Sequence, residues 1–178
     1  MNKKILHFVG LLGALAPAAM LATENVNPAP VSVVVTFDHP ENFADVKDGF
    51  LPTEKGRDGI LAQIRVFLES QAKSYLRSGQ KLEVKFTDID LAGEFEPQLG
   101  PRFHDVRIVK DIYRPRLQFE FKLTGADGKV ITEGKRDLMD LAFMMRSAFP
   151  PSDNLRFEKD ILSDWLRSDV RAPAKAAG

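Results

Sequence analysis

Apolar and polar residues alternate strictly in two stretches of the chain, which is the pattern of half-buried β-strands. The alternation is clearest in residues 82–87 (LEVKFT) and 116–123 (RLQFEFKL). A third strand is predicted at 129–137, joined to the second by a hairpin turn at Asp127-Gly128. A fourth lies at 31–37 (VSVVVTF), where valines on both faces favour a central place in a sheet.

Two further stretches repeat apolar residues at helical spacing. The first predicted helix covers residues 54–77, with Thr53 as its N-cap and Gly79 as its stop. The second covers residues 154–167. Its buried stripe is Phe157, Ile161, Leu162, Trp165 and Leu166, and its solvent face is Glu158, Asp160, Asp164 and Arg167.

The order of elements is strand, helix, strand, long insertion, two strands, helix. A strand–helix–strand unit makes a right-handed crossover, so the first two strands are expected to be parallel. We therefore predict a two-layer α+β domain, with a mixed, mostly antiparallel sheet of about four strands and both helices on one face. Residues 138–145 (LMDLAFMM) fit either a continued strand or a short helix.

The insertion, residues 88–116, is longer than most loops of compact domains, and long loops are often functional. It begins with four carboxylates that can gather around a hard cation such as Ca²⁺: Asp88, Asp90, Glu94 and Glu96. Their spacing does not match an EF-hand loop. The alternative is that they form turns and keep the loop hydrated.

The second half of the insertion is basic and interleaved with apolar residues. Its candidate anion-binding residues are Arg102, His104, Arg107 and Arg114. Such side chains can hold a phosphate, a lipid headgroup or an acidic partner. The alternative is pairing with the acidic half of the same segment. If Val106 and Ile108 point inward, Arg107 points outward and residues 105–109 form a short strand.

A zinc or general-base site is a third possibility, built from His39, His104 and nearby carboxylates such as Asp45 and Asp48. It requires the two histidines to meet. A ligand cleft between helix and sheet is a fourth, lined by groups such as Met139, Phe143 and Met144. The chain contains no Gly-x-Ser-x-Gly, His-Glu-x-x-His or phosphate-loop motif, so we assign no catalytic residue, metal ligand or cofactor.

Residues 1–22 have the features of a secretory signal peptide: Lys3 and Lys4, a short apolar stretch and a small-residue segment. The apolar stretch is shorter than the ~20 residues that span a membrane. We expect a flexible lead-in at 23–30, one domain at 31–168 and a disordered tail at 169–178. The chain has no cysteine, which excludes disulfides and a lipoprotein anchor.

Acidic and basic residues are equal in number, at 25 each. Loss of Lys3 and Lys4 with a signal leaves a slightly negative chain, which argues against nucleic acid as a partner. The oligomeric state is not indicated by the sequence.

Five stretches, in the same order along the chain, resemble the secreted Gram-negative family known as domain of unknown function 3016. They are VSVVVTFDHPENFADV (31–46), TEKGRDGILAQIRVFLESQAKSYL (53–76), LEVKFTDIDLAGEFEP (82–97), GPRFHDVRIVKDIYRPRLQFEFKL (100–123) and LRFEKDILSDWLR (155–167). The resemblance implies an export signal and one small α/β domain. It brings no activity or functional residue with it.

These observations favour an exported, periplasmic and non-enzymatic binding or accessory module of the cell envelope. It would act through the charged insertion on an envelope protein or an anionic ligand. The alternatives are a metal-dependent hydrolase and a small-molecule- or lipid-binding protein.

Overall fold

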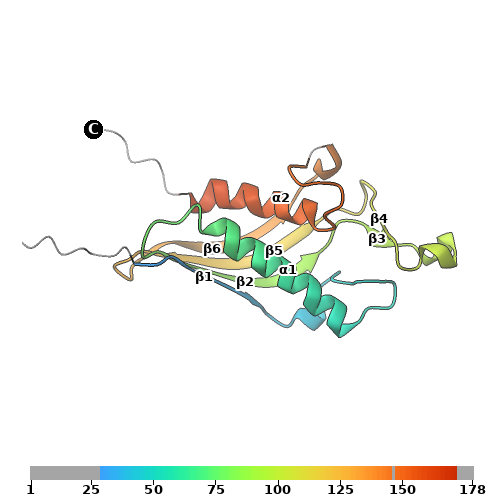
Figure 1. The fold of residues 1–178 in the computed structure, drawn as a ribbon, viewed down its shortest axis with the longest axis horizontal. Helices are drawn as coiled ribbons and strands as arrows, with labels where there is room; N and C mark the ends of the chain where they lie inside the picture. Colours follow the sequence, from blue (N-terminus) through green and yellow to red (C-terminus); the bar gives the residue numbers. More distant parts are fainter. Residues whose placement is uncertain (1–28, 146, 172–178) are drawn as a thin grey trace, which may run out of the picture.

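The computed structural model describes residues 29–145 and 147–171, so the predicted signal peptide lies outside the described residues. Its main sheet has four strands in the order β1-β2-β5-β6. The strands are β1 (Ser32–Phe37), β2 (Lys81–Asp90), β5 (Arg116–Thr124) and β6 (Val130–Met139). β1 and β2 are parallel and the other pairs antiparallel. The predicted α+β fold is confirmed (Figure 1).

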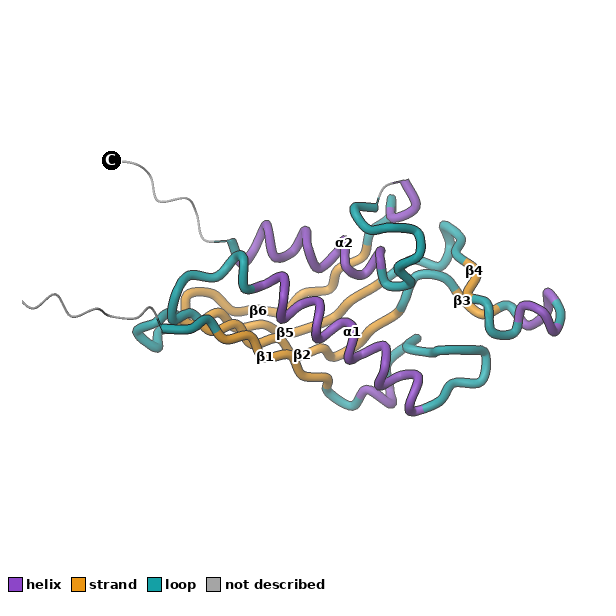
Figure 2. The backbone as a smooth tube through the Cα atoms, in the orientation of Figure 1, coloured by secondary structure: helices purple, strands orange, loops and turns teal. Residues whose placement is uncertain are grey.

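Two helices cover one face of this sheet, α1 (Glu54–Ala72) and α2 (Arg156–Trp165) (Figure 2). A π-helical turn, η5 (Leu166–Val170), continues α2 two residues beyond the expected domain end, and Val170 is buried. Within the described part of the chain, no helix is long and apolar enough to cross a membrane.

The core lies between the helices and one face of the sheet. Alternate residues of β2 and β5 point into it, as the period of two predicts. Phe119 packs against Phe86 and against Trp165 of α2, with ring centroids 5.3 Å and 4.7 Å apart. A bulge in β2 after Phe86 adds one residue, so that Ile89 rather than Asp88 returns to the core.

The opposite face of the sheet is charged. Two rows of side chains cross it from β2 through β5 to β6, and in each row the sign of the charge alternates. The first row is Lys85, Glu120 and Lys135, and the second is Glu83, Lys122 and Glu133. Opposite charges directly across strands stabilise a sheet modestly.

Helix α1 begins as predicted, because the Thr53 hydroxyl accepts a hydrogen bond from the Gly56 amide at 2.9 Å. It ends at Ala72, five residues before the predicted end, and the chain continues in tight turns at Ser74 and Tyr75. Gly79, which has a φ of 75°, then forms the turn into β2.

The strand prediction was wrong in one respect: β1 is an edge strand and not a central one. Its second face is partly apolar, but Val34 remains 39% exposed on the open face of the sheet. Alternating valines predict a β-strand, but they do not indicate whether that strand lies at the edge or in the centre of the sheet.

The insertion forms a second, two-stranded sheet from β3 (Glu94–Phe95) and β4 (Arg107–Ile108), so the predicted short strand is confirmed. Short 3-10 helices η2 (Pro97–Leu99) and η3 (Pro101–Phe103) connect them, and this part projects from the body (Figure 1). Two more occur elsewhere, η1 (Pro40–Asn42) and η4 (Phe143–Met145), so the ambiguous 138–145 segment contains both the end of β6 and a helical turn.

Candidate functional site

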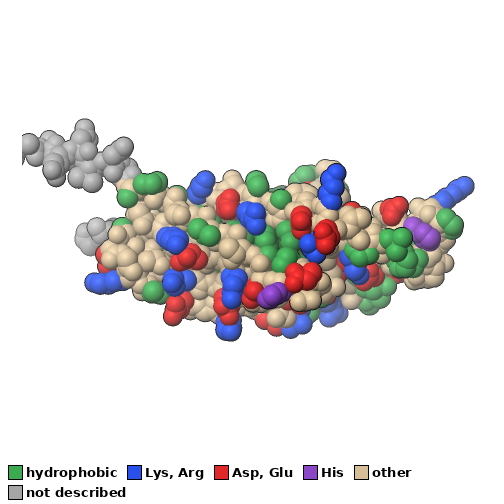
Figure 3. Space-filling model, turned by 90° about the horizontal axis from the view of Figure 1, so that it is seen from below, with side chains coloured by type: hydrophobic (Ala, Val, Ile, Leu, Met, Phe, Trp, Pro, Cys, Tyr) green, Lys and Arg blue, Asp and Glu red, His purple; other side chains and the backbone are tan. Residues whose placement is uncertain are grey.

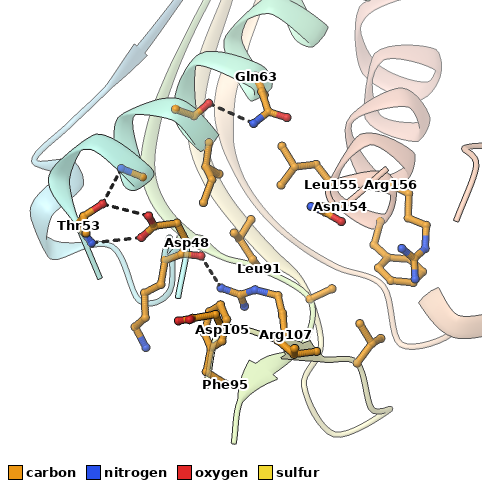
Figure 4. A pocket seen from close by; sticks show the side chains of 18 of the residues that line it. Asp48, Thr53, Gln63, Leu91, Phe95, Asp105, Arg107, Asn154, Leu155 and Arg156 are labelled. Atoms are coloured by element: carbon orange, nitrogen blue, oxygen red, sulfur yellow. Dashed lines mark hydrogen bonds between the residues drawn. The ribbon is translucent and has the colours of Figure 1, made fainter. Parts of the chain in front are cut away.

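A cleft of about 900 Å³ opens where the insertion meets the first turns of both helices (Figure 4). The crossover places the start of α1 at the carboxyl ends of β1 and β2, a usual position for ligand sites in α/β folds. Its walls are Leu91, Ala92, Phe95, Val106, Arg107 and Val109 of the insertion, with Lys55, Gly56, Gly59 and Ile60 of α1 and Asn154, Leu155, Arg156 and Phe157 at α2.

Arg107 fixes the insertion wall to the body of the protein. Its guanidinium donates to both carboxylate oxygens of Asp45, at 2.7 and 3.3 Å, and to the main-chain carbonyls of Gly93 and Lys47. It also stacks on Phe95, 4.6 Å from the ring centroid. Asp45 is buried, so this bidentate pair is a positioning clamp and not a free anion receptor.

The expectation that Arg107 points to solvent was therefore wrong. Its side chain is 17% exposed, whereas Val106 beside it is 45% exposed. A guanidinium can be buried when every donor finds an acceptor, and Asp45 supplies the acceptors from 62 residues away.

A second polar group holds the start of α1 against the cleft. Asp48 accepts hydrogen bonds from the amide and the hydroxyl of Thr53, at 3.2 and 3.0 Å. These bonds hold the pKa of Asp48 below its usual range. A Cβ on Gly56 would lie 1.9 Å from the Asp48 carboxyl carbon, so a glycine is required here for close approach.

Two of the three cations at the rim of the cleft are not paired with a carboxylate. Among the residues described, neither Lys55 nor Arg156 forms an ion pair. Arg156 stacks 4.2 Å from the Phe157 ring centroid and donates to main-chain carbonyls of Pro151 and Asp153. The third rim cation, Lys47, lies 3.7 Å from Asp45.

Behind the cleft, the Glu158 carboxylate joins α2 to the insertion. Its Oε1 accepts a hydrogen bond of 2.7 Å from the Ala92 amide, and its Oε2 has no partner. Burial raises the pKa of Glu158 to about 6, against the opposing effect of the Ala92 hydrogen bond and of Arg107 and Arg156. Glu158 is 1% exposed, so its predicted place on the solvent face of α2 was wrong.

The sequence contained the signal for this burial. Glu158 precedes Ile161, Leu162 and Trp165 by three, four and seven residues, which places it on the apolar stripe itself. The prediction that Glu158 faces solvent was based on its charge alone.

The outer insertion is held by a second cluster around buried Glu96. Lys110 and the Tyr113 hydroxyl both donate to this carboxylate at 2.7 Å. The Lys110 and Tyr113 hydrogen bonds lower the pKa of Glu96, and the bond to Glu96 raises the pKa of Lys110 and of Tyr113. Here the acidic half of the insertion pairs with its basic half, as the alternative reading expected.

The other predicted acidic residues do not converge with Glu96. Asp88 accepts from the Ala44 and Ile89 amides, and Glu94 accepts from the Phe95 amide and lies 3.9 Å from Lys47. Asp90 is partly buried, and this burial raises its pKa. The negative charges of Asp45 and Asp88 raise the pKa of Asp90 further. In the described ranges, no group of three or more histidine, aspartate or glutamate side chains could hold a metal ion.

The remaining basic candidates of the insertion are exposed. Arg114 donates to the Asp111 carbonyl, and Arg102 is exposed on η3. The His104 ring packs 5.9 Å from Phe50, while His39 lies beside Glu41 near the end of β1. Figure 3 shows apolar side chains gathered towards the outer part of the insertion; Phe50, Leu99, Phe103 and Val106 are each more than 40% exposed.

Of the three residues expected to line an apolar pocket between helix and sheet, Met139 borders a separate pocket between β6 and α2. Phe143 is buried against Phe157 in a small satellite core with Ala92, and Met139 and Met144 are 47% and 51% exposed. The cleft is built instead from Lys55, Gly59 and Arg156, which sequence reasoning missed. Gly56 and Gly59, two glycines one turn apart in an amphipathic helix, were the available signal.

Residues 31–168 match the model of a protein family, over more than half of the chain. Neither a curated protein nor a solved structure matches the sequence. The chain therefore belongs to the family described as "Protein of unknown function (DUF3016)".

Proposed function

We propose that this chain is a non-enzymatic binding module that holds a small organic anion with an apolar body in the cleft. The observation that carries the proposal is the combination of an apolar floor with two rim cations that form no ion pair among the described residues. Leu91, Phe95 and Leu155 belong to the floor, and Lys55 and Arg156 to the rim. The volume lies within the range of about 300–1,000 Å³ that is usual for ligand sites.

Electrostatics favours an anionic group at the helix end of the cleft. Both α1 and α2 begin at its wall, and the amino ends of helices carry partial positive charge. Lys55 lies in the first turn of α1 and Arg156 in the first turn of α2. A carboxylate between them would gain charge-assisted hydrogen bonds, while its apolar portion would contact the floor.

Gly59 supports the same proposal. A glycine inside a helix costs about 0.5–1 kcal/mol relative to alanine. A Cβ at Gly59 would meet no atom within 4 Å, so close packing does not require the glycine. Its missing side chain keeps one wall of the cleft open.

Binding is favoured over catalysis because the carboxylates in and behind the cleft, other than the exposed Asp105, are engaged. Asp45 is clamped by Arg107, Asp48 is held by Thr53, and Glu158 is sealed behind Ala92. A general base must reach the proton that it removes. The candidate arginines of the insertion have different roles in this proposal. Arg107 forms the wall of the cleft, whereas Arg102 and Arg114 remain available for contacts with an envelope partner.

We also propose that residues 1–22 direct export to the periplasm, because they combine a basic start with a short apolar stretch. Fractionation of cells that produce the full chain, with the mass of the released protein, tests this separately from ligand binding. An unprocessed chain in the cytoplasm would contradict it.

Calorimetric titration with octanoate, octan-1-ol and acetate tests the ligand class. We expect octanoate to bind more tightly than either the uncharged or the short compound, because it alone offers both the charge and the apolar body. Lys55→Gln and Arg156→Gln should each weaken octanoate binding several-fold and leave octanol binding unchanged. Lys73→Gln, just after the other end of α1, is the matched control.

Filling the cleft tests its location. Gly59→Leu should abolish octanoate binding while the protein stays folded, because the new side chain enters open space. Ala62→Leu places a leucine on α1 outside the cleft and should bind normally. Octanoate binding that survives Gly59→Leu would place the ligand elsewhere, and failure of octanoate and octanol alike to bind would reject the apolar site.

A further inference from the structure

The free edge of β6 is the longest unpaired strand edge among the described residues. β6 spans ten residues and pairs with β5 on one side only, whereas β1 at the opposite edge has six. The unpaired amide and carbonyl groups of such an edge can pair with another strand. What partner it accepts depends on the side chains beside it.

Charges at this edge are arranged in a self-complementary way. The row Lys85–Glu120–Lys135 ends at the edge with a positive charge, and the row Glu83–Lys122–Glu133 ends there with a negative one. Lys135 lies 2.7 Å from Glu120 but stays 84% exposed. Glu133 is exposed, and within the described chain it forms no ion pair or hydrogen bond.

From this arrangement we infer that two copies of this chain associate through antiparallel pairing of their β6 strands about Gly134. In that register, Glu133 of each copy lies opposite Lys135 of the other. Each row of one sheet then continues into the opposite row of its partner. The alternation of charge runs unbroken across six strands, from Lys85 to Glu83 of the second copy.

Other registers are less favourable. A pairing centred on Lys135 would set Lys135 against itself and Glu133 against Asp137, so like charges would face each other. One centred on Arg136 would pair fewer residues and oppose two arginines. The Gly134 register pairs residues 130–138 and places Arg136 opposite Thr132.

The charged side chain on the helix-covered face of β6 does not oppose this pairing. Arg136 donates to Asp169 at 2.5 Å and stacks 4.9 Å from the Phe121 ring centroid, so its charge is already compensated. Gly134 has no side chain at the symmetry axis. The two sheets would form one eight-stranded sheet with all four helices on one side.

Sedimentation velocity of the full chain over a range of concentrations tests the inference. We expect a monomer–dimer equilibrium. Lys135→Glu and Glu133→Lys should each raise the dissociation constant by about tenfold or more, because two attractive cross-strand pairs become repulsive. An equimolar mixture of the two variants should restore the dimer, since both pairs across the interface are then attractive again.

Cross-linking locates the axis. The chain has no cysteine, so Gly134→Cys introduces a single thiol. It should form a disulfide-linked dimer on mild oxidation, because the two positions face each other. Thr132→Cys is the control and should link poorly, since its two copies lie about 14 Å apart along the strands.

Each other outcome overturns the inference. A chain that stays monomeric at the highest soluble concentration shows that the charges protect the edge instead. A dimer that neither charge variant weakens, or that the mixture fails to restore, forms through another face. These results are independent of octanoate binding, since the cleft contains no residue of β6.

Discussion

The sheet–helix body and the insertion are stabilised by different interactions. In the body, Phe86, Phe119 and Leu162 are at most 1% exposed, and ring stacking joins sheet to helix. In the insertion, Arg107 and Glu96 collect charge-assisted hydrogen bonds while Phe103 stays 41% exposed. Apolar burial is non-directional and insensitive to pH, whereas ion pairs are directional and depend on both partners. The insertion is therefore expected to open without unfolding the body.

The largest effect is expected in the body. Phe119→Ala should lower the free energy of unfolding by about 3–5 kcal/mol, because a large buried side chain is lost between Phe86 and Trp165. Urea unfolding measures this. Val66→Ala, at a position that is 65% exposed, is the control and should change stability by less than about 0.5 kcal/mol. Equal effects of the two would contradict a core centred on Phe119.

Arg107→Ala should cost about 3 kcal/mol, because buried Asp45 is left without its partner. We expect the loss to be concentrated in the insertion and around residues 45–47. Hydrogen exchange should show faster exchange there, with β2 and β5 still protected. Arg107→Lys keeps the charge but loses the bidentate fork, and should give an intermediate result. Uniform loss of protection would show that body and insertion unfold together.

Glu158 tests the contact between the two regions. Its pKa is about 6 in the folded protein, above the ordinary 4.5, so folding favours the protonated form. Stability from this group is complete below pH 4.5 and falls by about 2 kcal/mol as the pH rises through 6. Glu158→Gln should remove this loss while an acceptor for the Ala92 amide is kept.

The free energy of unfolding must be measured for wild type and Glu158→Gln at each pH, and the difference between them is compared. Glu120 and Asp137 have lowered pKa values and contribute stability that is lost as the pH falls. If the difference in unfolding free energy between the two proteins stays constant from pH 4 to 7, the pKa of Glu158 is not raised.

The smallest effect is expected at the outer insertion. Glu96→Gln should return the pKa of the Tyr113 phenol towards its ordinary value, because the hydrogen bond to the carboxylate raises it. A spectroscopic titration follows this, and Tyr113→Phe identifies the signal against Tyr75. The unfolding of the body should be unchanged. A shift in the unfolding midpoint as large as that of Phe119→Ala would remove the distinction between the two regions.

Local pattern predicted much of the fold. The strands, both helices, the Thr53 cap and the Asp127-Gly128 turn follow from properties of adjacent residues, namely side-chain period and turn chemistry. The cleft was not predictable in this way. Arg107 contacts Asp45, which is 62 residues away in the sequence, and Ala92 contacts Glu158, which is 66 residues away. Neither contact can be predicted from the local sequence pattern.

The sequence by itself determined that four main strands and two helices form, in which order, and which family the chain belongs to. The tertiary structure alone decided that β1 lies at an edge, that Arg107 is a clamp and that Glu158 is buried. The physical reason is that periodicity reports how one element meets a surface. Strand order, ion-pair partners and clefts arise from the way several elements are placed together.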